Sequence, residues 1–372
     1  MEFTISKSDL VRELNLSQGV VEKKTTIPIL SNVLIEAAGD ELTVTATDLE
    51  LGIRSTVPAK VKTSGSGTIP AKRLLDYVRL LPDADVQIKF SDSHWASLSC
   101  GRSKSRIAGM SRESYPDLPD MAEPLGQISI GLLAGMIQKT IFSISAEESR
   151  FTLNGALLLL REGNMTMVAT DGHRLALVEQ PNPHAPEGLE HRALLPRKAM
   201  NELLKFAADS DDKDAPIDFG QDDNHLFFRL GPRLLMSRKL TGTFPDFERV
   251  LPRSHAHEVV IEKDELKASI ERVAQFADER SKAIKLRFSD NEATVHSSLS
   301  ESGESEESLP VEYTGPTVEI GFNAQYLLDF LRAVPESRVA FHFKDAQSAG
   351  EIRPSGDDLI YNYRYVVMPM RI

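Results

Sequence analysis

Apolar residues recur at helical spacing in three short segments spread evenly along the chain. The clearest is residues 74–82, LLDYVRLLP, in which Leu74, Leu75, Val78 and Leu81 fall on one face of a helix. The same order of apolar, acidic and basic positions returns at 327–335, LLDFLRAVP, and in weaker form at 200–207, MNELLKFA. A pattern that repeats after about one third of the chain is too long for a solenoid and fits a globular domain. We therefore predict three domains of one fold.

Strand patterns fill the rest of each third in a common order. In the first third, apolar and polar residues alternate at 2–6 and 86–90, and the segments 32–37 and 42–46 predict a hairpin. In the last third, the acidic, serine-rich residues 298–308 predict a solvated loop. The order of strand, helix, hairpin, strand, helix and three strands predicts an α+β domain with a mostly antiparallel sheet. We expect sheets to continue from one domain into the next, with each domain's two helices on one face.

Two polar, proline-containing segments separate the copies of this pattern, at 120–126 and 252–258. They predict domains at residues 1–122, 123–253 and 254–372.

Composition adds limits on where the protein acts. The chain is 41% apolar and 26% charged, as is typical of globular proteins. Apolar runs such as 156–160 are too short to span a membrane, and the N-terminus does not resemble a signal peptide. The single Cys100 has no partner for an internal disulfide, which fits a reducing compartment. We expect a cytoplasmic protein without a membrane role.

Charge is unevenly distributed along the chain. The formal net charge of −12 excludes a surface that is basic all over but allows a local basic one. Basic residues are frequent on the predicted helices, whereas acidic runs such as 209–214 and 301–307 lie in predicted loops. Helices placed on one side would form a surface for polyanions, binding phosphate in a salt-dependent, sequence-independent way. The alternative interpretation is an ordinary solvated helix face.

The most enzyme-like segment is residues 170–174, TDGHR. Asp171 and His173 could serve as an acid–base pair or as metal ligands in a hydrolase. Asp48 follows the same Ala-Thr pair in the first third but has no histidine after it, so the aspartate belongs to the repeated scaffold. We therefore predict no catalytic residue, no metal site and no cofactor, and keep a metal- or His-dependent hydrolase at Asp171 and His173 as the alternative.

Several longer motifs resemble one protein family. The closing residues 365–372, YVVMPMRI, the segment 169–175, ATDGHRL, and residues 244–252, FPDFERVLP, resemble the bacterial sliding clamp, the beta subunit of DNA polymerase III. So do 26–30, TIPIL, and 320–323, IGFN. The match runs over the whole chain, including the threefold repeat. The resemblance implies three tandem DNA-clamp domains and a closed ring made by two copies of the chain.

The resemblance also implies a function without catalysis. The ring would encircle duplex DNA independently of sequence and tether the replicative polymerase for processivity. The implied partners are double-stranded DNA, a second copy of the chain, the DNA polymerase III alpha subunit, the clamp loader, and other polymerases and repair proteins. The proteins would bind through short peptide motifs.

Site residues are carried over by matching motifs. The implied partner-peptide groove comprises Leu153, Thr170, Gly172, His173, Arg174, Leu175, Pro245, Arg249, Val250, Asn323, Tyr326, Val366, Val367, Met368, Pro369, Met370 and Arg371. The implied DNA contacts are Lys24, Arg150, Phe151, Arg197 and Lys198, to which the basic first turn of the first repeated helix adds Lys72 and Arg73. The implied dimer seam includes Gln275 and Phe276, where Gln275 is polar at a position that is apolar in relatives.

Overall fold

The computed structural model describes residues 1–21, 26–147, 149–161, 163–184, 188–299 and 303–371. The chain divides into two compact units, the first mainly from Met1–Leu132 and Lys198–Lys239, the second mainly from Leu133–Pro183 and Leu240–Ile372. These units do not follow the three repeats, because strands of the middle repeat contribute to a sheet in each unit. The predicted domain boundaries therefore stay a prediction.

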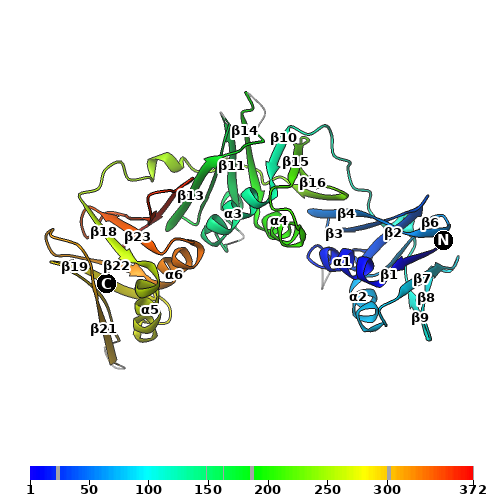
Figure 1. Ribbon diagram of the computed structural model, residues 1–372, viewed down its shortest axis with the longest axis horizontal. Helices are drawn as coiled ribbons and strands as arrows, with labels where there is room; N and C mark the ends of the chain where they lie inside the picture. The colour runs from blue at the N-terminus through cyan, green and yellow to red at the C-terminus, as the bar shows by residue number, and fades with distance from the viewer. Residues whose placement is uncertain (22–25, 148, 162, 185–187, 300–302, 372) are drawn as a thin grey trace. The chain divides into compact units, whose positions relative to one another are not determined.

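The first unit contains two antiparallel sheets with helices packed against them (Figure 1). Its elements are β1 (Glu2–Ser6), α1 (Lys7–Ser17), β2 (Asn32–Ala38), β3 (Glu41–Thr47), β4 (Leu51–Pro58), β5 (Lys60–Thr63), β6 (Gly65–Pro70), α2 (Ala71–Leu80), β7 (Asp85–Phe90), β8 (Trp95–Cys100), β9 (Ser103–Ala108), β10 (Gly126–Ser129), α4 (Arg197–Asp209), β15 (Pro216–Gln221), β16 (His225–Leu230) and β17 (Arg233–Arg238). The sheets have the orders β5-β1-β7-β8-β9 and β10-β15-β16-β17-β4-β3-β2-β6. The antiparallel pairing of β17 with β4 confirms that strands of one repeat continue the sheet of another.

The second unit repeats this architecture. Its elements are α3 (Ile130–Thr140), β11 (Gly155–Arg161), β12 (Asn164–Thr170), β13 (Arg174–Pro181), β14 (His191–Pro196), β18 (His257–Glu262), α5 (Lys263–Val273), β19 (Ala283–Ser289), β20 (Glu292–Leu299), β21 (Gly303–Pro310), β22 (Val318–Asn323), α6 (Ala324–Ala333), β23 (Arg338–Phe343), β24 (Gly350–Ser355) and β25 (Asn362–Val367). The sheets run β14-β11-β12-β13-β25-β24-β23-β18 and β21-β20-β19-β22. Here β13 and β25 join the middle and last repeats, with Leu175 opposite Val366.

The repeated helices bury the face that their apolar spacing predicts. In α2, Leu74, Leu75 and Val78 are buried on the sheet, while Lys72 and Arg73 of the first turn are exposed. Helix α1 packs beside α2 in the first unit, and α5 packs beside α6 in the second (Figure 1). Because the apolar stripe packs on the sheet, the basic side chains on the opposite side of the helix face solvent. Within the described part of the chain, no helix is long and apolar enough to span a membrane.

Two expectations about strands were wrong. Residues 298–308 are not a loop in the part that is described, because β20 extends to Leu299 and β21 begins at Gly303. In addition, more than three strands separate the two helices of each repeat: β2 to β6 in the first, β11 to β14 in the middle and β19 to β22 in the last. Strand β21 is polar along most of its length because it lies at a sheet edge, so it has no apolar alternation to reveal it.

Candidate partner groove and nucleic-acid surface

A tight turn between β12 and β13 forms the centre of the candidate groove. The Asp171 Oδ1 atom accepts hydrogen bonds from the backbone N–H groups of His173 and Arg174, at 2.9 and 3.1 Å. The Thr170 hydroxyl accepts from the Gly172 N–H and donates to the Arg174 carbonyl. Gly172 has a φ of +89°, a conformation that glycine adopts without strain. The Asp-Gly pair therefore shapes a rigid turn that presents His173 to solvent.

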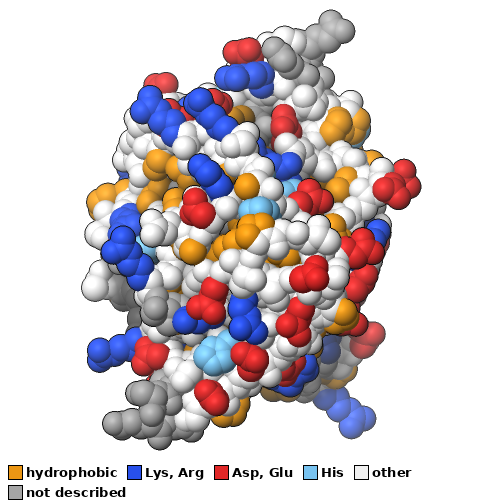
Figure 2. All heavy atoms as spheres, turned by 90° about the vertical axis from the view of Figure 1, so that its left-hand side faces the viewer, with side chains coloured by type: hydrophobic (Ala, Val, Ile, Leu, Met, Phe, Trp, Pro, Cys, Tyr) orange, Lys and Arg blue, Asp and Glu red, His pale blue; other side chains and the backbone are white. Residues whose placement is uncertain are grey.

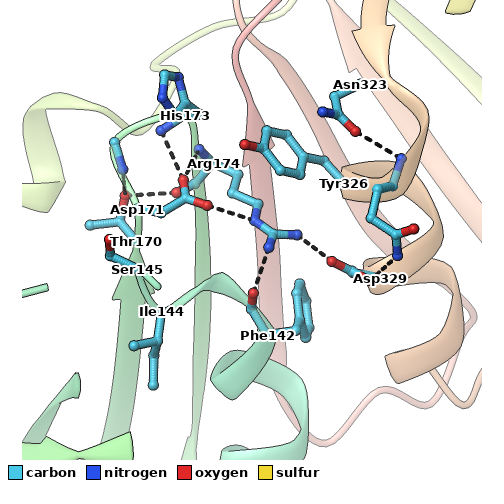
Figure 3. A network of polar contacts seen from close by, with 12 residues as sticks. Phe142, Ile144, Ser145, Thr170, Asp171, His173, Arg174, Asn323, Tyr326 and Asp329 are labelled. Atoms are coloured by element: carbon cyan, nitrogen blue, oxygen red, sulfur yellow. Dashed lines mark hydrogen bonds and ion pairs between the residues drawn. The ribbon is translucent and has the colours of Figure 1, made fainter. Parts of the chain in front are cut away.

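Arg174 ties this turn to the last repeat (Figure 3). Its guanidinium lies 3.0 Å from Asp171 Oδ2 and 2.6 Å from Asp329 Oδ2 on α6, and it donates to the Phe142 carbonyl at 2.6 Å. The same group lies over the Tyr326 ring, 4.3 Å from its centroid. Burial lowers the pKa of Arg174, but contacts with Tyr365, Asp329 and Asp171 outweigh it and raise the pKa. The Arg174 side chain therefore stays charged and links the turn to α6.

This geometry gives the hydrolase alternative no support. Both oxygens of Asp171 are occupied, one by backbone N–H groups and the other by Arg174. The carboxylate is therefore fixed as a structural acceptor. Among the described residues, no group of three or more His, Cys, Asp and Glu side chains could hold a metal ion.

The C-terminal segment lies against the same turn. The Met368 N–H donates to the His173 carbonyl at 2.9 Å, and the Met370 N–H donates to the Gly321 carbonyl at 2.8 Å. The segment thus bridges the middle and last repeats with its backbone. Met368 keeps 39% of its surface exposed, so it offers a flexible apolar side chain next to His173.

An apolar cluster supports the groove from beneath. Leu175, Val366 and Phe244 are buried in it, with Leu153 partly buried at its edge. Phe244 anchors the segment that exposes Pro245, Arg249 and Val250. The structure therefore brings the predicted groove residues together in the second unit, some as buried supports and others as an accessible rim.

Three supporting residues were missing from the predicted groove. Asp329 and the Phe142 carbonyl hold Arg174, and Phe244 packs beneath the rim. A signal existed for Asp329, which is the acidic position of the repeated helix. Asn323, predicted for the groove, caps α6 by accepting from the Gln325 N–H and donates to the Ser281 carbonyl.

The predicted DNA contacts fall into two environments. In the first unit, Lys72, Arg73 and Lys198 are exposed on α2 and α4. In the second unit, Arg150 pairs with Glu147 and donates to the Asp171 carbonyl.

Phe151 and Arg197, two further predicted DNA contacts, differ in their exposure to solvent. The Phe151 side chain is 68% exposed. Arg197 is half-buried and donates to the Ile144 carbonyl at 2.6 Å. Burial and, to a smaller extent, Arg174 lower the pKa of Arg197. Arg197 therefore has a structural role in addition to any phosphate contact. Lys24 lies outside the described residues.

The predicted seam residues follow α5. Gln275 and Phe276 are both exposed, and the Phe276 ring lies beside Gly303 at the start of β21. Figure 2 views the side of the molecule on which Figure 1 shows β18, β19 and β21, and acidic side chains gather in the lower and right-hand parts of that view.

Comparisons with known proteins agree over the whole chain. Family models of the DNA polymerase III beta subunit match with the N-terminal domain at residues 1–119, the central domain at 127–246 and the C-terminal domain at 248–371. The beta sliding clamp of Chlamydia muridarum is 36% identical over 373 residues, covering 100% of this chain and 99% of the relative. That of Pseudomonas aeruginosa is 33% identical with full coverage of both.

Solved structures give the same result. The DNA polymerase III subunit beta from Pseudomonas aeruginosa has a TM-score of 0.93 at 32% identity, covering 100% of both chains. The sliding clamp from Bacillus subtilis has a TM-score of 0.94 at 27% identity, covering 100% of this chain and 99% of that one. The chain therefore belongs to the DNA polymerase III beta subunit family and is a sliding clamp.

Proposed function

We propose that two copies of this chain form a closed ring around duplex DNA and hold replication proteins there without catalysing a reaction. One observation carries the proposal: two sheet edges of the chain have opposite charge. Strand β9 is an edge of the five-stranded sheet and exposes Lys104 and Arg106. Strand β21 is an edge of the four-stranded sheet and exposes Glu304 and Glu306.

Open edges with opposite charge favour pairing between different edges of two molecules. Unpaired backbone groups of an edge strand can add to a second chain, and charge complementarity selects the partner edge. A head-to-tail contact between β9 of one copy and β21 of another, used twice, closes a two-membered ring. Gln275 and Phe276, which precede β21, would border this seam.

The groove around Arg174 would receive short peptides of the partner proteins. Partly buried apolar side chains such as Leu153 and Phe247, together with the exposed His173, Arg249 and Met368, suit an extended segment with apolar anchors. We infer the same partners as above: the DNA polymerase III alpha subunit, the clamp loader, and other polymerases and repair proteins. We further infer a cytoplasmic site of action and domains at 1–122, 123–253 and 254–372.

Topological holding on DNA is the property to test. The chain is loaded onto a closed circular plasmid by a clamp loader, and the DNA-bound fraction is followed by gel filtration before and after one restriction cut. We expect retention on the circle and loss after the cut, because a ring leaves through a free end. Retention on the linear form would contradict the ring and indicate ordinary affinity for DNA.

A further inference from the structure

An open groove in the first unit is lined by the polar faces of three helices. Helices α1, α2 and α4 border a space of about 710 Å³, and Lys72, Arg79, Lys198 and Lys205 reach into it. Four cations around one groove suit a polyanion. The three lysines, however, each contact a carboxylate of the same chain.

Lys198 is held by a carboxylate that is fixed in place. Its Nζ atom lies 3.0 Å from Asp48 Oδ2 and 3.7 Å from an oxygen of the exposed Glu50 side chain. Asp48 Oδ1 accepts from the backbone N–H groups of Glu50 and Leu51 at 3.0 and 2.7 Å. The Asp48 side chain is only 5% exposed, whereas that of Lys198 is 60% exposed. The negative charge is therefore rigid and buried beneath a cation that DNA can reach.

Lys205 has a similar partner on its own helix. Its Nζ atom lies 2.8 and 3.0 Å from the two oxygens of Glu202, whose side chain is 5% exposed. Gly19 leaves room for this pair, since a Cβ atom there would lie 2.1 Å from the Lys205 Nζ. Burial raises the pKa of Glu202, and Lys205 opposes that effect. The environment disfavours the charge, so burying Glu202 does not by itself stabilise the fold.

The third pair is of the ordinary surface kind. Lys72 and Asp76 lie one helical turn apart with their charged atoms 2.5 Å from each other, and both side chains are more than half exposed. Such pairs rearrange freely in water and contribute little. Asp48 and Glu202 differ from Asp76 because burial holds them in place. A phosphate that approaches Lys198 or Lys205 must therefore compete with these carboxylates for the lysine.

We propose that Asp48 and Glu202 are built-in counter-charges that weaken the hold of Lys198 and Lys205 on DNA phosphates, so that these contacts exchange quickly as the ring moves. The inference rests on the proposed function. A lysine that is already neutralised contributes less to phosphate binding than a free one. The two carboxylates are positioning residues that act through the lysines.

The test compares Asp48→Asn and Glu202→Gln with Asp92→Asn in the full chain. Asp92 is exposed in the turn between β7 and β8, so its variant changes the net charge equally without touching the groove. Asparagine at position 48 keeps an oxygen that can accept the two backbone N–H groups. The probe is a fluorescent 30-base-pair duplex, and its anisotropy is measured over a range of salt concentrations.

We expect each groove variant to bind the duplex about 3- to 10-fold more tightly than the control, with the logarithmic salt slope steeper by up to about 0.9. Adding Lys198→Gln to Asp48→Asn, or Lys205→Gln to Glu202→Gln, should remove the gain. On DNA closed at both ends, the single variants should diffuse more slowly in single-molecule tracking.

Two results would overturn the inference: affinity no greater than that of Asp92→Asn, or a gain that survives removal of the paired lysine. Thermal unfolding identifies a variant that does not fold, in which case the other variant decides. Failure of the unsubstituted chain to remain on circular DNA would instead overturn the proposed function. Retention of that chain, together with unchanged affinity of the variants, would overturn the counter-charges alone.

Discussion

At the scale of single residues, Arg174 decides how the groove is held together. In Arg174→Lys, one ammonium cannot reach Asp171, Asp329 and the Phe142 carbonyl at once, because the guanidinium fork is lost. We expect the free energy of unfolding to fall by about 2 kcal/mol, since hydrogen bonds to charged groups are lost. Affinity for a labelled peptide with apolar anchors should fall about tenfold, because Tyr326 loses its contact with the guanidinium. Urea denaturation and fluorescence anisotropy measure the two effects.

A matched control lies on the rim of the same groove. Arg249 is 83% exposed and pairs only with the nearby Asp246 among the contacts described, so Arg249→Lys should change stability by less than about 0.5 kcal/mol. Normal peptide binding by Arg174→Lys would contradict the role of Arg174 in linking the turn to α6.

Sequence patterns identified the turn but not what holds it. The segment 170–174 stands out for its composition, and its comparison with Asp48 predicts a shared scaffold, which the structure shows as two aspartates that each accept from two backbone N–H groups. The partner of Arg174 on α6 is 155 positions away, and no local spacing indicates that contact. Such long-range ion pairs form only after the sheets have joined. Patterns of neighbouring residues in the sequence do not predict that joining.

At the scale of elements, a buried carboxylate links β24 to its neighbours. Glu351 is fully buried and accepts from Arg353, Arg364 and His255. Burial, the largest single influence, raises its pKa, but the hydrogen bonds from Arg364 and Arg353 together lower it below the ordinary value of 4.5. A lowered folded-state pKa means that the stabilisation is complete above about pH 4.5 and is lost as the pH falls through the folded value.

Glu351→Gln should therefore destabilise the fold at neutral pH and remove part of the acid sensitivity. We expect a loss of about 2 kcal/mol at pH 7, because the partly buried Arg364 and the more exposed Arg353 lose hydrogen bonds to a charged group. Urea denaturation at pH 7 and near pH 4 should show the gap between the variant and the unsubstituted chain narrowing with acid. A gap of equal size at both pH values would contradict this account, and Glu262→Gln, exposed at the end of β18, is the control.

Elements were predictable where one face is buried. Apolar spacing located α2 and α6, because Leu74 and Leu75 in α2, like the leucines of α6, are buried while the opposite side meets water. It did not locate β21, whose exposed glutamates and serines carry no alternation. Edge strands contribute backbone hydrogen bonds rather than apolar surface, so the sequence signal for them is weak.

At the scale of the whole molecule, the repeat predicts three similar copies but not how they join. The pairing of β17 with β4 and of β13 with β25 turns separate patterns into continuous eight-stranded sheets. The repeat suggested that sheets continue between domains, but it could not predict which strands pair. The register between strands that are distant in sequence depends on how they pack. The groove residues came from resemblance, since their side chains meet only after the sheets have joined.

The proposed ring depends on the opposite charges of the β9 and β21 edges. We expect Lys104→Glu with Arg106→Glu to convert dimers into monomers at micromolar concentration, because both edges are then acidic and like charges repel across the seam. Adding Glu304→Lys and Glu306→Lys should restore the dimer with reversed polarity. Analytical ultracentrifugation measures the dissociation constant of each variant at low and high salt.

Restoration of the dimer by the changes at Glu304 and Glu306 would show that the β9 and β21 edges pair. A general effect of net charge needs a separate control. Exchanging Asp92 for lysine and Lys344 for glutamate, both exposed outside the β9 and β21 edges, keeps the same kinds of change away from the proposed contact and should leave the dimer intact. Salt should strengthen the dimer of the doubly acidic variant and weaken that of the unsubstituted chain, since screening reduces repulsion and attraction alike. A dimer that tolerates the reversal at β9 without compensation at β21 would show that the ring, if it forms, closes through other surfaces.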